Sequence, residues 1–130
     1  MRAVWLRKFG GPEVLLAEET PDPVPGEGQA LVEVVASGIT YVETLVRSGS
    51  APMRLPPLPI IPGNGVTLVP MGAAFPSAAA MQELSVQALA DGAVGRLRPA
   101  IGQTFPLERV ADAHAAIGAR TALGKTLLIT

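Results

Sequence analysis

The chain has 130 residues, of which 48% are hydrophobic and 16% are charged, and its formal net charge is −1 at pH 7. This composition excludes an intrinsically disordered chain and gives no electrostatic reason to expect nucleic acid or an anionic membrane as a partner. Because the chain has no cysteine and only one histidine, disulfides are excluded and the ligand set for zinc is poor, so we expect a metal-free protein.

The first 38 residues have the pattern of short strands. Residues 2–8 and 13–19 are rich in apolar side chains and are separated by the turn-forming letters GGP, which predicts a hairpin-like pair of strands. The proline- and glycine-rich residues 20–29 predict a loop. The valine-rich sequence ALVEVVASG at 30–38 predicts the strongest strand of the chain.

The apolar period changes to that of a helix at residues 40–49, which end in Gly49. Thr40 and Glu43 match a capping box at the start of this helix, and Glu43 stands four residues before Arg47, the spacing of a helical ion pair. These structural roles explain the three polar side chains without any catalysis.

The second half of the chain is richer in helices. Residues 50–66 contain too many prolines for a helix or a central strand and predict an extended segment, followed by a brief strand at 66–72. Helices are predicted at 76–92, with Ser77 as N-cap, and at 106–118. Further expected elements are an extended segment at 97–102 and a final strand at 124–130. The fold class indicated is α+β.

Two sequence features invite a functional interpretation and do not support one. ARTALGKT at 119–126 loosely matches a phosphate-binding loop, but a predicted helix precedes it and a strand follows it, which reverses the required order. His114 lies in an apolar helical stripe, where a histidine is usually packed with its nitrogens satisfied, and no triad partners accompany it. The residues alone therefore indicate a domain without a self-contained catalytic constellation.

Several phrases in order resemble the zinc-free quinone oxidoreductases of the medium-chain dehydrogenase/reductase superfamily. They are the N-terminal segment with FGGPEVL, the helix phrase ITYVETLVRSG, the approach LPIIPG and the closing segment FPLERVADAHAAIGARTALGKTLL. The resemblance implies a partial GroES-like β-barrel with C-terminal helices, with the Rossmann domain essentially deleted after Val66. Residues 1–66 would be the N-terminal part of the catalytic domain. Residues 67–130 would hold the last Rossmann strand and helix and the return to the catalytic domain, the whole forming one compact domain.

The resemblance also implies site residues and a cofactor. Thr40, Tyr41, Glu43 and Arg47 would belong to the cleft for substrate and nicotinamide, with Thr40 at the position of the family's asparagine. Arg120 and Lys125 would lie near the edge of the cofactor. The intact family transfers hydride from NADPH to a quinone or enone, whereas this chain has no glycine fingerprint for a dinucleotide. We therefore expect no tight NADPH binding, no assignable catalytic residue and no metal.

Two functional hypotheses remain open. The first is a shortened oxidoreductase-family chain with little or no activity by itself. The alternative is a redox-inactive binding or scaffold module that uses a half-barrel and exposed helices to hold a ligand or another chain. Open sheet edges would favour a homodimer, in which strands or helices could be exchanged between the two copies. The sequence shows no signal peptide and no apolar stretch of membrane-spanning length, so we expect a cytoplasmic protein.

Overall fold

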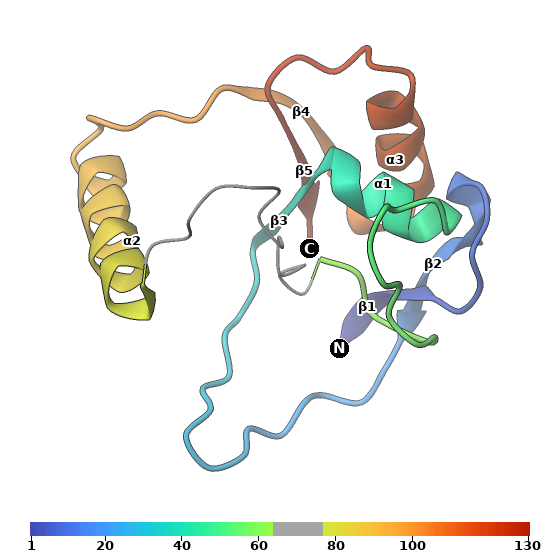
Figure 1. Ribbon diagram of the computed structural model, residues 1–130, viewed down its shortest axis with the longest axis horizontal. Coiled ribbons are helices and arrows are strands. Elements are labelled where there is room, and N and C mark those ends of the chain that lie inside the picture. Colours follow the sequence, from blue (N-terminus) through green and yellow to red (C-terminus); the bar gives the residue numbers. More distant parts are fainter. Residues whose placement is uncertain (64–76) are drawn as a thin grey trace. The chain divides into compact units, whose positions relative to one another are not determined.

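A computed structural model describes residues 1–63 and 77–130 of the chain (Figure 1). Two compact units are distinguished: Met1–Val66 together with Ile101–Thr130, and Thr67–Ala100. The first unit thus joins the N-terminal half of the chain with its last 30 residues. The strand expected at 66–72 lies outside the described residues.

The N-terminal hairpin is confirmed. Strand β1 (Arg2–Leu6) pairs antiparallel with β2 (Leu15–Glu19), so that Leu6 faces Leu15. A single 3₁₀ turn, η1 (Pro12–Val14), precedes β2 and shortens the expected second strand, because its proline occupies the first helical position. The backbone of Leu6 also pairs with Ile60 of the proline-rich segment. As expected, this segment forms no helix up to residue 63, but it is not extended throughout, because it bends at 52–53 and 58–59 and turns at 62–63.

A three-stranded sheet combines the two ends of the chain. Its order is β3 (Ala36–Ile39), β5 (Lys125–Ile129) and β4 (Ile101–Pro106), with β5 antiparallel to β3 and parallel to β4. The final strand was predicted, whereas β4 was expected only as an extended segment ending at 102. The β4 register shifts between Ile101 and Gln103, where a Cβ on Gly102 would overlap the carbonyl oxygen of Leu123. This close approach requires glycine.

Both helices expected in the first unit are present. Helix α1 (Tyr41–Ser48) begins after its N-cap Thr40 and ends at Gly49, whose φ of 80° is the left-handed conformation of a glycine C-cap. The second begins with a 3₁₀ turn, η2 (Leu107–Arg109), and continues as α3 (Val110–Gly118). Helix α3 packs against α1, β2, β4 and β5, so it links the hairpin to the sheet.

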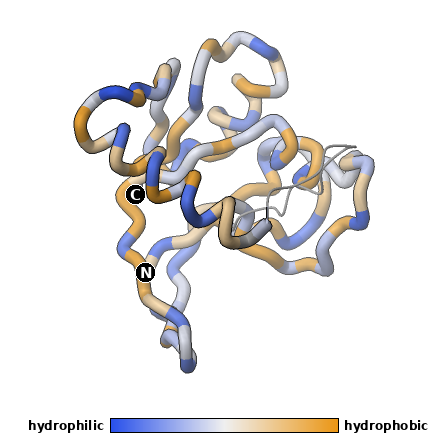
Figure 2. Tube along the Cα trace, turned by 60° about the vertical axis from the view of Figure 1, so that its left-hand side comes forward, coloured by the Kyte–Doolittle hydropathy of each residue, from blue (hydrophilic) through white to orange (hydrophobic). Residues whose placement is uncertain are grey.

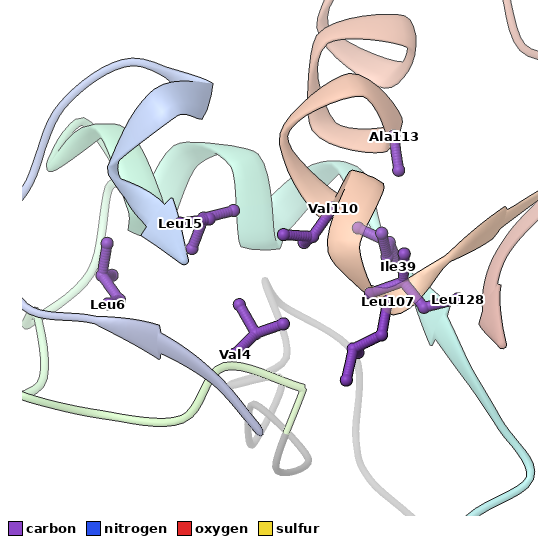
Figure 3. Close-up of a cluster of buried hydrophobic side chains, with 8 residues drawn as sticks. All are labelled: Val4, Leu6, Leu15, Ile39, Leu107, Val110, Ala113 and Leu128. Atoms are coloured by element: carbon purple, nitrogen blue, oxygen red, sulfur yellow. The ribbon is translucent and has the colours of Figure 1, made fainter. Parts of the chain in front are cut away.

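The hydrophobic core lies between these elements (Figure 3). Side chains from β1, β2, β3, β5, η2 and α3 point toward one another there. The eight buried members are Val4, Leu6, Leu15, Ile39, Leu107, Val110, Ala113 and Leu128. Because the cluster draws on residues 4–15, 39 and 107–128, burial of apolar surface is what holds the distant parts of the chain together.

The prediction of a long strand at 30–38 was wrong for its first half. Residues 31–35 carry no assigned strand, and all positions from 21 to 36 are exposed. Valine-rich sequence forms a strand only when a neighbour covers it, since β-propensity reflects packing on a partly buried surface. Within the described part of the chain, β5 covers that segment only at its end, where Thr130 N–H donates to the Val35 carbonyl at 3.3 Å.

The second unit contributes one described helix, α2 (Ala78–Ala93), as predicted. Its N-cap Ser77 accepts a hydrogen bond from the backbone N–H of Ala80 at 3.2 Å. No helix among the described residues is long and apolar enough to cross a membrane.

The described elements make a mixed fold of helices and two small sheets. Figure 2 shows apolar and polar residues interspersed along the trace. Several large apolar side chains are exposed, among them Val24, Leu89 and Leu123. The partial GroES-like barrel stays a prediction.

Candidate functional site

The register of the three-stranded sheet brings two distant segments together. In the antiparallel pair of β3 and β5, Ile39 faces Thr126. Thr40 follows β3 directly and Lys125 opens β5, so both lie at the same end of the sheet. Helix α1 starts at this end with Tyr41, and the turn that leaves α3 reaches it with Arg120.

A pocket of about 440 Å³ opens at this end of the sheet. Its lining comes from the β3–α1 junction, the last turn of α3 and the loop into β5: Ile39, Thr40, Tyr41, Ile117, Arg120, Ala122, Gly124, Lys125 and Thr126. Four of the six site residues expected from the resemblance are therefore neighbours: Thr40, Tyr41, Arg120 and Lys125. Among the described lining residues the only charged side chains are the cations of Arg120 and Lys125, so the pocket attracts anions.

The backbone of Arg120 is in an unusual conformation. Its φ of 55° is the only positive value at a non-glycine residue in the described ranges, and such backbone costs on the order of 1 kcal/mol or more. The conformation ends α3, because the Arg120 N–H donates to the Ile117 carbonyl at 3.0 Å. It also places the guanidinium 5.6 Å from the ring centre of Tyr41, within cation–π range. The strained backbone of Arg120 thus places its guanidinium beside the aromatic ring of Tyr41.

Glu43 and Arg47, the other two expected site residues, lie elsewhere and are buried, with 7% and 8% of their surface exposed. The Glu43 carboxylate accepts a hydrogen bond from the Thr40 backbone N–H at 2.5 Å, which is the reach-back half of a capping box. Arg47 donates to the Gly10 carbonyl at 2.5 Å and joins α1 to the loop before η1. The ion pair expected between Glu43 and Arg47 is absent from the described interactions, because Arg47 turns to that carbonyl.

His114 is more deeply buried than the sequence indicated. Only 3% of its surface is exposed, and its Nδ1 has no hydrogen-bond partner among the described residues, so the expectation of satisfied nitrogens was wrong for this atom. Burial lowers its pKa to about 4, and the positive charge of Arg47 acts in the same direction. Since neither residue lines the pocket, this pair belongs to the packing of α1 on α3.

Sequence reasoning missed the small residues that open the pocket. Ala122 and Gly124 lie in the loop whose letters imitate a phosphate-binding loop, and the structure places this loop after helix α3 and before strand β5. The expected reversal of element order is therefore confirmed. The usable signal was the concentration of small and cationic residues at 119–125.

Comparison with known proteins supports a common origin for the segments that form the pocket. The sequence model of the zinc-binding dehydrogenase family matches residues 22–128, which include every lining residue. Quinone oxidoreductase from Pongo abelii is 49% identical over 67 residues, covering 51% of this chain and 20% of the relative. The human quinone oxidoreductase is 48% identical over 67 residues, which again cover 51% of this chain and 20% of the relative. An alcohol dehydrogenase from Rhizobium meliloti is 41% identical over 64 residues, or 49% of this chain and 18% of the relative.

The matched part of this chain spans about a fifth of the length of these relatives. The family match, in contrast, extends over most of the chain. The chain belongs to the zinc-binding dehydrogenase family of the medium-chain dehydrogenase/reductase superfamily, and part of it is similar to quinone oxidoreductases.

Proposed function

We propose that this chain forms the nicotinamide- and quinone-binding wall of a quinone oxidoreductase-like site and binds NADPH weakly by itself. The observation that supports this proposal is the grouping of Arg120 and Lys125 with the ring of Tyr41 in one pocket. Guanidinium and ammonium groups bind phosphates, and flat rings stack on aromatic side chains. A ligand that carries both phosphate and a flat ring suits this combination.

Bound NADPH would supply a hydride, and a quinone that takes up this hydride and one proton leaves as hydroquinone while NADP⁺ remains. The residues of this chain would act by binding and orientation. Arg120 and Lys125 would hold anionic groups, and the Tyr41 ring would face a flat ring. The hydroxyl of Thr40 would donate a hydrogen bond to a carbonyl oxygen of the substrate.

Binding by this chain is expected to be weak. Its sequence has no G-x-G-x-x-G motif, the feature that places a pyrophosphate on the N-terminus of a helix. Contacts to one part of a dinucleotide leave most of the entropy cost of association uncompensated. We expect a Kd of about 0.1 to 1 mM and NADPH oxidation close to the uncatalysed rate.

The family's description implies zinc, but the donors of this chain do not fit that metal. There is no cysteine, and the single histidine is buried in the packing of α3. The described residues contain no group of three or more possible ligands. Structural and catalytic zinc sites require three or four such side chains, so no step of the proposed function passes through a metal.

Replacement of Arg120 by alanine tests the proposed site. Calorimetric titration of the chain with NADPH should give an affinity about ten- to a hundredfold lower for Arg120→Ala, because a hydrogen bond to a charged group contributes about 1.5 to 3 kcal/mol. Arg54→Ala is the matched control, since Arg54 is exposed, lies in the same unit and does not line the pocket. Circular dichroism checks that both variants fold.

The same samples separate the two functional hypotheses. A loss of affinity in Arg120→Ala alone supports the oxidoreductase wall. Equal affinities in both variants, or no saturable heat with NADPH at millimolar concentration, would refute it. The redox-inactive binding module predicts the second result.

A further inference from the structure

Three arginines of the described chain lie over aromatic rings, and one of them differs from the other two. In two of these pairs the arginine also binds a carboxylate: Arg7 over Trp5 with Glu18, and Arg109 over Phe105 with Asp112. Arg120, which lies over the ring of Tyr41, makes no ion pair with any described residue, and residues 64–76 contain neither Asp nor Glu. The charge of Arg120 is therefore available to an anionic ligand.

The end of helix α3 fixes the backbone of Arg120 but not its side chain. The Arg120 N–H donates to the Ile117 carbonyl at 3.0 Å and the Thr121 N–H donates to the Ala116 carbonyl at 3.4 Å, which are the two bonds of a Schellman motif. The residue with positive φ in this motif is usually glycine, and here it is Arg120, with a φ of 55°. The motif sets the direction in which this side chain leaves the backbone, so the position of the guanidinium depends on a further contact.

We propose that Tyr41 is the positioning residue for Arg120, and that its ring holds the guanidinium ready to bind an oxyanion in the pocket. This inference rests on the anion-binding role of Arg120 in the proposed function. The N–H groups of a guanidinium lie in its plane, so a ring against its flat face leaves them free to donate two parallel hydrogen bonds to a phosphate. An aromatic ring has two faces, and the second face of Tyr41 remains for a flat ring of the ligand.

Tyr41 suits this role because a fixed helical turn carries it. The capping box of Thr40 and Glu43 sets the first turn of α1, and the Thr44 hydroxyl donates to the Tyr41 carbonyl at 2.6 Å. The side chain is not held by the core, since 46% of Tyr41 is exposed. A cation after the last turn of a helix is favourable by itself, but that structural role of Arg120 needs no aromatic partner.

Inorganic pyrophosphate, which has no ring, separates positioning of Arg120 from stacking of Tyr41 on a ligand. In calorimetric titrations Tyr41→Leu should lower the affinity of the chain for pyrophosphate about two- to fivefold, because a guanidinium released from the ring must be ordered when the anion binds. Tyr41→Phe keeps the ring and should bind as the unmodified chain does. Trp5→Leu is the matched control: it breaks an arginine–aromatic pair outside the pocket and should leave the affinity unchanged.

The free, unmodified chain supplies a second readout that requires no variant. Nuclear Overhauser contacts should join the ring protons of Tyr41 to the side chain of Arg120. Absence of these contacts, equal affinities of Tyr41→Leu and Tyr41→Phe for pyrophosphate, an equal loss in Trp5→Leu, or no saturable heat at millimolar pyrophosphate would each overturn the proposal.

The Arg120→Ala variant distinguishes failure of this inference from failure of the proposed function. If Arg120→Ala loses affinity for NADPH while Tyr41→Leu keeps its affinity for pyrophosphate, Arg120 binds the cofactor without help from Tyr41, and only this inference is refuted. If Arg120→Ala keeps its affinity for NADPH, the proposed function is refuted, and the inference that rests on it is refuted as well.

Discussion

Acidification from pH 7 to pH 4 should lower the free energy of unfolding by about 3 kcal/mol through His114. The folded protein holds this side chain neutral with a pKa of about 4, whereas its ordinary value is 6.5. The unfolded chain therefore binds a proton between these two values while the folded chain does not. Stability from this group is complete above pH 6.5 and is lost as the pH falls toward 4, at about 1.4 kcal/mol per pH unit.

The measurement is urea unfolding at several pH values between 4 and 7.5, followed by circular dichroism. His114 is the only histidine of the chain, so few other side chains titrate in the upper part of this range. His114→Gln removes the titration and should give a nearly flat profile between pH 7 and 5. Parallel profiles for the two proteins would show that this histidine is not held neutral by burial.

Leu6→Ala should lower the free energy of unfolding by about 2 to 5 kcal/mol, the range for emptying a fully buried leucine site. Leu6 is completely buried and belongs to the core shared by the hairpin, α3 and the sheet (Figure 3). Its backbone bonds to Ile60, at 2.8 and 3.0 Å, do not depend on the side chain. The loss therefore reports apolar packing, and urea unfolding at pH 7 measures it.

Two control variants accompany this measurement. Leu123→Ala makes the same change at a position that is 86% exposed, and should alter stability by no more than about 0.5 kcal/mol. Leu6→Met keeps the volume and should cost less than about 1.5 kcal/mol. If Leu6→Ala proved no more destabilising than Leu123→Ala, the common core of the N- and C-terminal segments would be refuted.

The sequence was informative where the decisive interactions are local. The GGP turn, the capping pattern at Thr40 and the glycine after Ser48 act within a few residues, and the hairpin and α1 follow them. It was misleading at residues 30–35, where valine content indicated a strand but no strand among residues 1–63 and 77–130 covers them. Strand β4 was not predicted as a strand. Its formation depends on pairing with β5, a long-range contact that the local sequence does not indicate.

The candidate site was predictable only in part. The resemblance supplied Thr40, Tyr41, Arg120 and Lys125, and the register of β3 on β5 explains how these residues become neighbours. Residue spacing alone could not join them, because some 80 positions separate the two groups. The capping pattern gave Glu43 a structural role from the start, but nothing in the sequence indicated that Arg47 would bond to Gly10 instead of Glu43.

The most direct test of the proposed pocket is a ¹H–¹⁵N correlation spectrum of the isotopically labelled chain, recorded during titration with NADPH. A chain of 13.4 kDa gives resolved backbone signals, and each signal reports on its own residue even when binding is weak. We expect concentration-dependent shifts at 39–41 and at 117–126, the two segments that line the pocket. Shifts confined to other parts of the chain, such as α2, or no shifts at millimolar NADPH would contradict the assignment of this pocket as a nicotinamide cofactor site.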